Sequence, residues 1–187
     1  MHSHPKPRGR MKIGTPLALT IACLALVVPA STAFAGTGGV GGPGTGGGSG
    51  PAGKAKLRKG LAIPPSNAPS RVVKVIKAAN QIAKGKEYCM GGGHGSWRDN
   101  CYDCSGSISY ALHGGGFVDS PMPSGSYTGW GKKGKGKWIT VYANGGHMYA
   151  VIAGLRFDTS MTPGAGPGWS SEMRSSSGFS VRHPNNF

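Results

Sequence analysis

Acidic side chains are scarce in this chain of 187 residues: Asp and Glu number 6 against 21 Lys and Arg, a formal net charge of +15. A protein this basic associates with polyanions. Long apolar runs are lacking as well. The segment IGTPLALTIACLALVVPA follows a basic start, is broken by Pro16 and Pro29, and is followed by STAFA. This pattern is typical of a secretory signal peptide and argues against a transmembrane anchor.

Export determines which polyanions the protein meets. We expect a signal peptide over residues 1–35, cleaved after Ala35, and a secreted protein associated with a bacterial cell wall. The signal peptide holds four basic residues and no acid, so the mature chain keeps 17 Lys and Arg against 6 acids, a net charge of +11. The expected partners are peptidoglycan and anionic wall polymers. We expect no nucleic-acid partner, no stable membrane insertion after cleavage, and a monomer.

The remaining chain divides by composition. Residues 36–69 are rich in Gly and Pro, carry a basic cluster, and predict a disordered linker. Residues 70–187 predict one α+β domain, because helical periodicity comes first and strand patterns follow. One helix is expected from an N-cap at Ser70 to a stop at Gly85, and a second begins near Cys104. Strand patterns cover residues 137–143, 147–154, 156–160 and 179–183, and predict an antiparallel sheet.

Cysteine is rare too, and three cysteines remain after cleavage: Cys89, Cys101 and Cys104. Thiols tend to pair in an oxidising compartment, and an odd number leaves one over. One alternative is a zinc site that adds His94, but structural zinc sites usually pair their ligands closely at both ends. Another is a redox C-x-x-C pair of Cys101 and Cys104, which normally lies in a βαβ unit. The third pairs Cys89 with Cys101 as a disulfide and leaves Cys104 free.

A free thiol at the start of a helix suits a nucleophile. The dipole and the free amides of a helix N-terminus favour the thiolate form of Cys104. Gly106 allows another chain or a substrate to come close, and the backbone amides of Cys104 and Ser105 can donate to a developing oxyanion. The alternative is an inert buried cysteine.

A thiolate nucleophile needs a base, and the base needs a partner that orients it. His147 opens the most apolar strand, in NGGHMYAVIAG, where it can be held rigidly and still face a cleft. Asp158 falls near it across the next turn, and a carboxylate there would fix the tautomer and stabilise an imidazolium. We therefore predict His147 as the base and Asp158 as its partner. The alternative for Asp158 is a turn or surface acid.

Three segments together resemble the NlpC-type cell-wall peptidases, which are papain-like cysteine hydrolases of peptidoglycan. They are YCMGG at 88–92, DCSG at 103–106, and GH at 146–147 with a short hairpin to Asp158. The resemblance covers residues 70–187. It implies a papain-like α+β fold, and hydrolysis of a stem-peptide bond, often between D-glutamate and a diamino acid. It implies no metal or organic cofactor.

The resemblance also assigns roles to individual residues. The nucleophile, the base and the third polar residue are those chosen above, Cys104, His147 and Asp158. Tyr88 matches a tyrosine that flanks the cleft and helps the oxyanion site. Asp103 and Ser105 match positions that line the substrate cleft, although Asp103 also suits a helix cap.

The sequence departs from this family in three places. Met90 stands where relatives usually carry an aromatic residue, WITVYANGG replaces a proline-glycine-aspartate turn before His147, and the basic turn GKKGKGK at 131–137 is unusual. We predict a secreted cysteine endopeptidase acting on peptidoglycan. The alternatives are an amidase or acyltransferase of the same fold, and a catalytically silent basic module that binds the wall.

Overall fold

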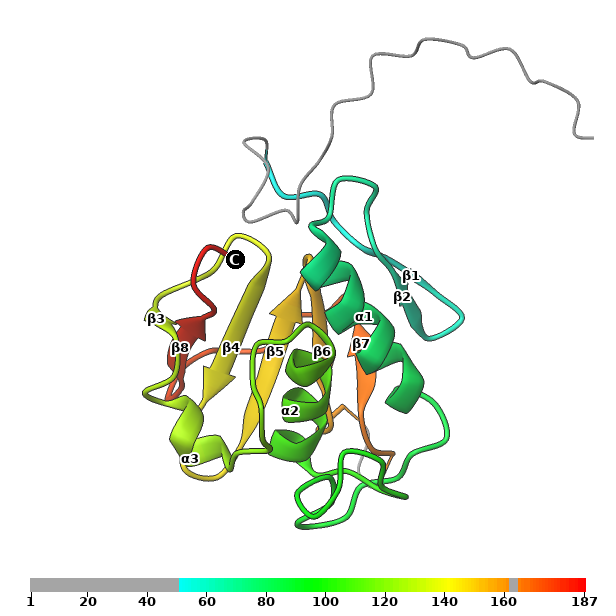
Figure 1. Cartoon of the computed structure of the whole chain (residues 1–187), viewed down its shortest axis with the longest axis vertical. Coiled ribbons are helices and arrows are strands. Elements are labelled where there is room, and N and C mark those ends of the chain that lie inside the picture. The colour runs from blue at the N-terminus through cyan, green and yellow to red at the C-terminus, as the bar shows by residue number, and fades with distance from the viewer. Residues whose placement is uncertain (1–50, 162–164) are drawn as a thin grey trace, which may run out of the picture. The chain divides into compact units, whose positions relative to one another are not determined.

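The structure is a computed structural model that describes residues 51–161 and 165–187. The predicted signal peptide and the predicted linker up to residue 50 lie outside the described residues. Within the described part of the chain, no helix has the length and apolar character that a membrane crossing requires. The helices are α1 (Ser70–Ile82), α2 (Cys104–Gly114) and α3 (Ser124–Tyr127). The strands are β1 (Lys56–Arg58), β2 (Leu61–Ile63), β3 (Lys132–Lys133), β4 (Ile139–Ala143), β5 (Met148–Ile152), β6 (Leu155–Asp158), β7 (Gly168–Ser170) and β8 (Ser180–His183) (Figure 1).

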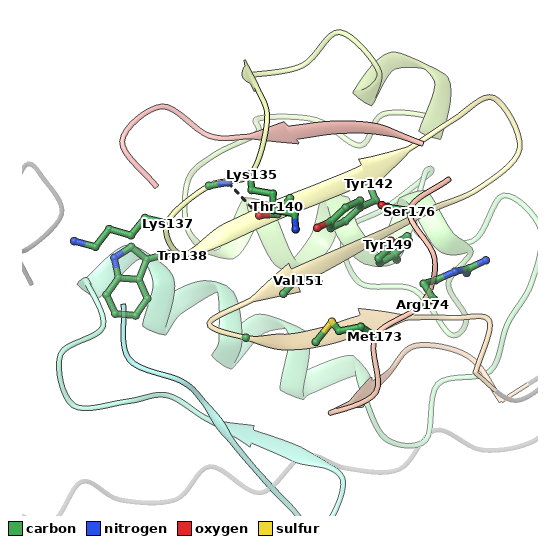
Figure 2. A pocket seen from close by; sticks show the side chains of 12 residues that line it. Lys135, Lys137, Trp138, Thr140, Tyr142, Tyr149, Val151, Met173, Arg174 and Ser176 are labelled. Atoms are coloured by element: carbon green, nitrogen blue, oxygen red, sulfur yellow. Dashed lines mark hydrogen bonds between the residues drawn. The ribbon is translucent and has the colours of Figure 1, made fainter. Parts of the chain in front are cut away.

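Six strands form one sheet in the order β3-β8-β4-β5-β6-β7, and every neighbouring pair is antiparallel. Strands β4 and β5 pair at its centre, with Tyr142 opposite Tyr149. Alternate side chains of a strand point to opposite faces of the sheet. Met148 and Ala150 of β5 are fully buried in the core, whereas Tyr149 and Val151 point to the other face, which Figure 2 shows from close by. Only one face of the sheet therefore meets the helices.

Helices α1 and α2 pack on each other, and α2 packs on β5 and β6. Both helices lie in front of the sheet in Figure 1. The apolar stripe of α1 is buried, and comprises Val72, Val75, Ile76, Ala79 and Ile82. Burial of such a stripe removes apolar surface from water and is the main source of stability at this interface. The predicted α+β fold, with N-terminal helices packed on an antiparallel sheet, is confirmed.

The predicted linker is wrong over its last part, because β1 and β2 form an antiparallel hairpin there. Ala62 of the hairpin is buried against α1. The side chain of Asn80 bonds both backbone polar groups of Ala62: its Oδ1 accepts from Ala62 N at 3.0 Å, and its Nδ2 donates to Ala62 O at 2.8 Å. The basic residues in KAKLR alternate with apolar ones, a strand pattern that the surrounding Gly and Pro concealed.

The ends of α1 and α2 differ in how well the sequence predicted them. Ser70 is not the N-cap of α1; Pro69 takes that position, and no side chain caps the helix. The helix ends at Ile82, before Gly85, which follows in a turn with a positive φ of 76°. Helix α2 starts at Cys104 as predicted. The side chain of Asp103 caps it by accepting a hydrogen bond from Gly106 N at 2.7 Å.

Candidate active site

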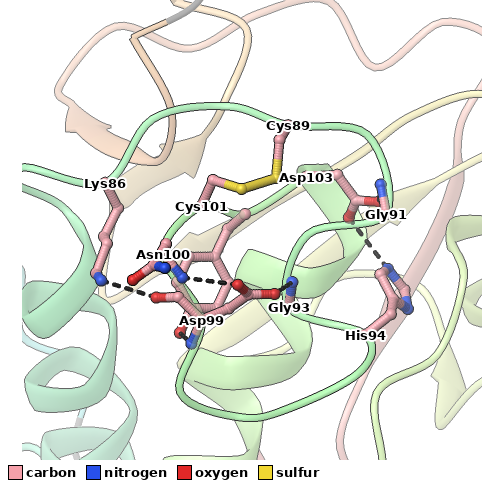
Figure 3. Close-up of a disulfide and its surroundings, with 10 residues drawn as sticks. Lys86, Cys89, Gly91, Gly93, His94, Asp99, Asn100, Cys101 and Asp103 are labelled. Carbon is pink, nitrogen blue, oxygen red and sulfur yellow. Dashed lines mark hydrogen bonds and ion pairs between the residues drawn. A yellow bond between two sulfur atoms is a disulfide. The ribbon is translucent and has the colours of Figure 1, made fainter. Parts of the chain in front are cut away.

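The loop before α2 is closed by a disulfide between Cys89 and Cys101, and Cys104 is the free cysteine of the described residues (Figure 3). The disulfide that the odd cysteine count predicted is therefore present. The disulfide uses Cys89 and Cys101, which are two of the four ligands proposed for zinc. It also uses Cys101 of the proposed C-x-x-C pair. Within residues 51–161 and 165–187, no cluster of three or more His, Cys, Asp or Glu side chains is placed to hold a metal ion.

Cys104 is the first residue of α2 and is 8% exposed. Helical hydrogen bonding starts with Ser107 N donating to Asp103 O at 3.0 Å. The amides of Cys104 and Ser105 are therefore first-turn donors without an acceptor inside the helix. This places two backbone N–H groups beside the sulfur, the arrangement that can stabilise an oxyanion.

Glycine lets the loop reach the helix here. A Cβ on Gly106 would lie 2.0 Å from the carbonyl oxygen of Gly92, which is backbone and cannot swing aside. The same carbonyl accepts from Asp103 N at 3.1 Å. The close approach that Gly106 was expected to allow is made here by the disulfide loop.

His147 is held just ahead of β5 by a turn that begins at Asn144. Its backbone N donates to Asn144 Oδ1 at 2.9 Å, and its carbonyl accepts from Asn144 N at 3.0 Å. Its Nε2 lies 3.1 Å from Asp158 Oδ1. The register of β5 and β6 pairs Ala150 with Phe157, so Asp158 reaches His147 diagonally along one face of the sheet.

The imidazole also faces the nucleophile candidate. His147 interacts with the side chain of Cys104, and because Nε2 is turned to Asp158, the ring nitrogen left for the sulfur is Nδ1. Hydrogen bonds with Asp158 and with Cys104 raise the pKa of His147 from 6.5 to about 9, against the opposing effect of burial. The structure thus brings Cys104, His147 and Asp158 into one connected chain, the arrangement of a cysteine nucleophile, its base and an orienting carboxylate.

Asp158 is a buried anion with several partners. Burial alone would raise the pKa of its carboxyl, but hydrogen bonds from His147 and from the backbone and hydroxyl of Ser160 outweigh it and hold that pKa at about 2. Arg174 Nη1 donates to its Oδ2 at 3.2 Å, and Arg156 Nε forms an ion pair at 3.6 Å. The carboxylate is therefore ionised and fixed at neutral pH, and the surface-acid alternative does not describe it.

Sequence reasoning predicted His147 as a partner of Asp158 but missed Arg156, Ser160 and Arg174. Arg156 lies two residues before Asp158 on the same strand, so strand alternation could have placed both on one face. Ser160 follows two residues later, a spacing at which Asp side chains often bond the backbone. Arg174 comes from the segment between β7 and β8, and no local signal points to it.

The other three predicted site residues divide into two groups. Tyr88 is 36% exposed, and burial followed by the nearby charges of Cys104 and Asp103 raises the pKa of its phenol. It therefore lies near the sulfur as a neutral donor. Asp103 and Ser105 are buried. Asp103 accepts from Gly91 N, and both side chains contact His94 Nε2 at 3.1 Å, so they tie the disulfide loop to α2 (Figure 3). Their contact with substrate stays a prediction.

Comparison with known proteins adds a likeness of fold. Solved structures similar to the chain include the following three. The P60 domain of an antigen from M. avium subspecies paratuberculosis is 19% identical, with a TM-score of 0.43, and the match covers 60% of this chain and 93% of that one. A hypothetical invasion protein of Mycobacterium tuberculosis is 22% identical over 71% of this chain and 69% of its own, with a TM-score of 0.46.

A third similar structure is a mutated form of the resuscitation promoting factor interacting protein RipA, 21% identical over the same shares, with a TM-score of 0.46. No model of a protein family and no curated protein matches the sequence.

The charge state of His147 is directly measurable. In a ¹⁵N NMR titration, we expect the His147 imidazole to lose its proton with a midpoint near pH 9. Because the pKa is raised in the folded protein, the stability that the imidazolium contributes is complete below pH 6.5 and is lost as the pH rises through about 9. Asp158→Asn should move the midpoint toward 6.5, since Asp158 is the largest cause of the shift. An unchanged midpoint in Asp158→Asn would contradict the pairing.

Proposed function

We propose that this protein is a secreted cysteine endopeptidase that hydrolyses peptide bonds in the stem peptides of peptidoglycan. The observation that carries the proposal is the connected chain of Cys104, His147 and Asp158 at the N-terminus of a helix. The substrate class comes from the resemblance of the DCSG and GH segments to cell-wall peptidases. The bond between D-glutamate and a diamino acid is the first candidate on the same ground.

The geometry supports a two-step acyl transfer. Cys104 attacks the scissile carbonyl as the thiolate, with its proton held by His147, whose pKa of about 9 favours the imidazolium at neutral pH. The amides of Cys104 and Ser105, with the phenol of Tyr88, donate to the oxyanion. The imidazolium then gives its proton to the leaving amine, and water activated by His147 releases the acyl group from sulfur. Asp158 keeps Nε2 as the protonated nitrogen throughout, so Nδ1 is the atom that moves the proton.

Charge would bring the enzyme to its substrate. A mature net charge of +11 favours association with an anionic wall, and salt should weaken that association because it screens exposed charges. Export by the predicted signal peptide would place the protein where wall polymers are the available polyanions.

The direct test is digestion of purified peptidoglycan by the protein and by Cys104→Ala. We expect the unaltered protein to release stem-peptide fragments and Cys104→Ala to release none, with circular dichroism showing that the variant is folded. Mass analysis of the products identifies the bond: fragments of the stem peptide indicate an endopeptidase, and intact stem peptides freed from the sugar indicate an amidase.

Two results would overturn the proposal. One is undiminished release by Cys104→Ala, and the other is a mass map of active protein with Cys104 in a disulfide. A protein that binds walls equally well with and without the thiol, and releases nothing in either form, would be the silent wall-binding module.

A further inference from the structure

The sheet face that points away from the helices carries a cavity of about 360 Å³. Its floor is formed by alternate side chains of β4 and β5, and the turn before β4 and the segment after β7 form its walls (Figure 2). Its lining comprises Lys135, Gly136, Lys137, Trp138, Thr140, Tyr142, Tyr149, Val151, Gly154, Met173, Arg174 and Ser176. Neither Cys104 nor His147 lines it, but Arg174 does and also bonds Asp158, so the cavity adjoins the candidate active site without containing its reacting groups.

The basic turn at residues 131–137 forms the rim of this cavity through Lys135 and Lys137, and its backbone is fixed. Lys132 and Lys133 pair with β8, and Gly134 N donates to Val181 O at 2.9 Å. Gly136 N donates to Thr140 Oγ1 at 3.1 Å. A Cβ on Gly136 would lie 2.2 Å from the carbonyl oxygen of Ile139, so the turn fits closely against β4. Because the backbone of the turn is fixed, Lys135 and Lys137 stay at the cavity.

No Asp or Glu lines the cavity, although Arg174, one of its donors, is already bonded to Asp158. Three of its lining residues are cationic, Lys135, Lys137 and Arg174. In Figure 2 the side chain of Lys135 lies over β4 beside Thr140. Among the described residues, no carboxylate forms an ion pair with Lys135. Thr140, Tyr142 and Ser176 add hydroxyl groups. Burial raises the pKa of Tyr142, so its phenol stays a neutral donor at neutral pH.

We propose that this cavity, with the basic turn as its rim, is a binding site for an anionic wall polymer. The ligand group is an oxyanion, phosphate or carboxylate, on a sugar or polyol unit whose hydroxyls meet the hydroxyl side chains. The volume lies at the lower end of the range for small-ligand sites, which suits one such unit. Neighbouring charged units of the polymer would continue along the other lysines of the turn. The site requires no catalysis, so it stands whether or not the proposed peptidase activity does.

The concave shape favours a polymer over a membrane. Binding to a lipid surface relies on exposed apolar side chains next to the basic ones. Met173 is the one lining residue among the exposed large apolar side chains of the described residues, and a single such side chain is little for a lipid surface. The lysines of the turn carry ammonium groups, which suit a polyanion that releases counterions on binding. The test therefore includes lipid vesicles, and binding to them alone would point to a membrane.

The test measures binding of the full chain, carrying Cys104→Ala so that nothing is digested, by titration calorimetry. The probes are poly(glycerol phosphate), polygalacturonate and vesicles of phosphatidylglycerol, and the two polymers separate the phosphate source from the carboxylate source. We expect saturable, salt-sensitive binding to at least one polymer. Lys135→Gln/Lys137→Gln should raise its Kd about tenfold, the effect of losing one charge-assisted hydrogen bond.

A matched variant separates a local site from net charge. Lys74→Gln/Lys77→Gln removes two exposed lysines from α1 and lowers the net charge by the same amount. We expect its Kd to change less than twofold. Thr140→Val, which alters the cavity floor and no charge, should weaken binding as well. Equal losses in both lysine pairs, no saturable polymer binding, or binding to the vesicles alone would overturn the proposal.

Discussion

Replacing His147 with alanine is expected to lower kcat/KM for stem-peptide hydrolysis by about 10³-fold. The imidazole is the group that holds the proton of Cys104 and gives it to the leaving amine, whereas the ring of His94 is bonded to Asp103 and Ser105. The loss should appear mainly in kcat, because a proton shuttle acts in the transition state and contributes little to ground-state binding. Kinetics on a purified stem peptide would measure it.

The matched control is His183→Gln. His183 lies on β8 and its Nδ1 bonds Pro184 O at 3.0 Å, away from the candidate active site. It should keep activity within about twofold, as expected for a substitution outside the reacting groups. Both variants should retain the fold, since the His147 side chain is 22% exposed. Retention of full activity in His147→Ala would remove the proposed mechanism, whatever the outcome for Cys104.

Gly106→Ala is expected to destabilise the folded state by about 3 kcal/mol and to lower activity about 10²-fold. The new Cβ would collide with the carbonyl oxygen of Gly92 at 2.0 Å, so either the disulfide loop or the first turn of α2 must move. Either shift displaces Cys104, which lies two residues away on that turn. Urea unfolding followed by tryptophan fluorescence measures the stability, and the peptide assay measures the activity.

Gly125→Ala provides the comparison. Gly125 lies in α3, and a Cβ there would meet nothing within 4 Å. Alanine has a higher helix propensity than glycine by up to about 1 kcal/mol, so this variant should be as stable as the unaltered protein or slightly more. Similar behaviour of the two alanine variants would show that the loop does not need its close contact with α2.

The parts of the site that the sequence predicted are those set by local rules. Cys104 was predicted as the nucleophile because it lies at the start of a helix. The disulfide was predicted because thiols of an exported chain tend to pair, and three cysteines then leave one free. The pairing of His147 with Asp158 follows from a tight hairpin, because the turn at Ala153 and Gly154 has positive φ at both residues and fixes the register of β5 and β6. Register then places both side chains on one face of the sheet.

The parts that sequence reasoning missed depend on distant segments. Arg174 reaches Asp158 from a segment 16 residues later, and Asn80 holds a hairpin 18 residues earlier. Neither contact leaves a periodic signal, because each is a single polar side chain placed by the packing of whole elements. The same holds for the cavity, whose lining comes from two strands and three connecting segments.

The β1–β2 hairpin determines where the folded unit begins. Asn80 Oδ1 accepts from Ala62 N and also from Trp169 Nε1 at 2.9 Å, so one amide joins the hairpin, α1 and β7. Ala55 N further bonds the turn after β5 through Ala153 O at 2.8 Å. A shortened protein that starts at Ser70, where helical periodicity first becomes visible, would strip these partners from two buried polar groups and uncover the flank of α1. Recombinant versions should therefore retain the residues from Lys54 onward.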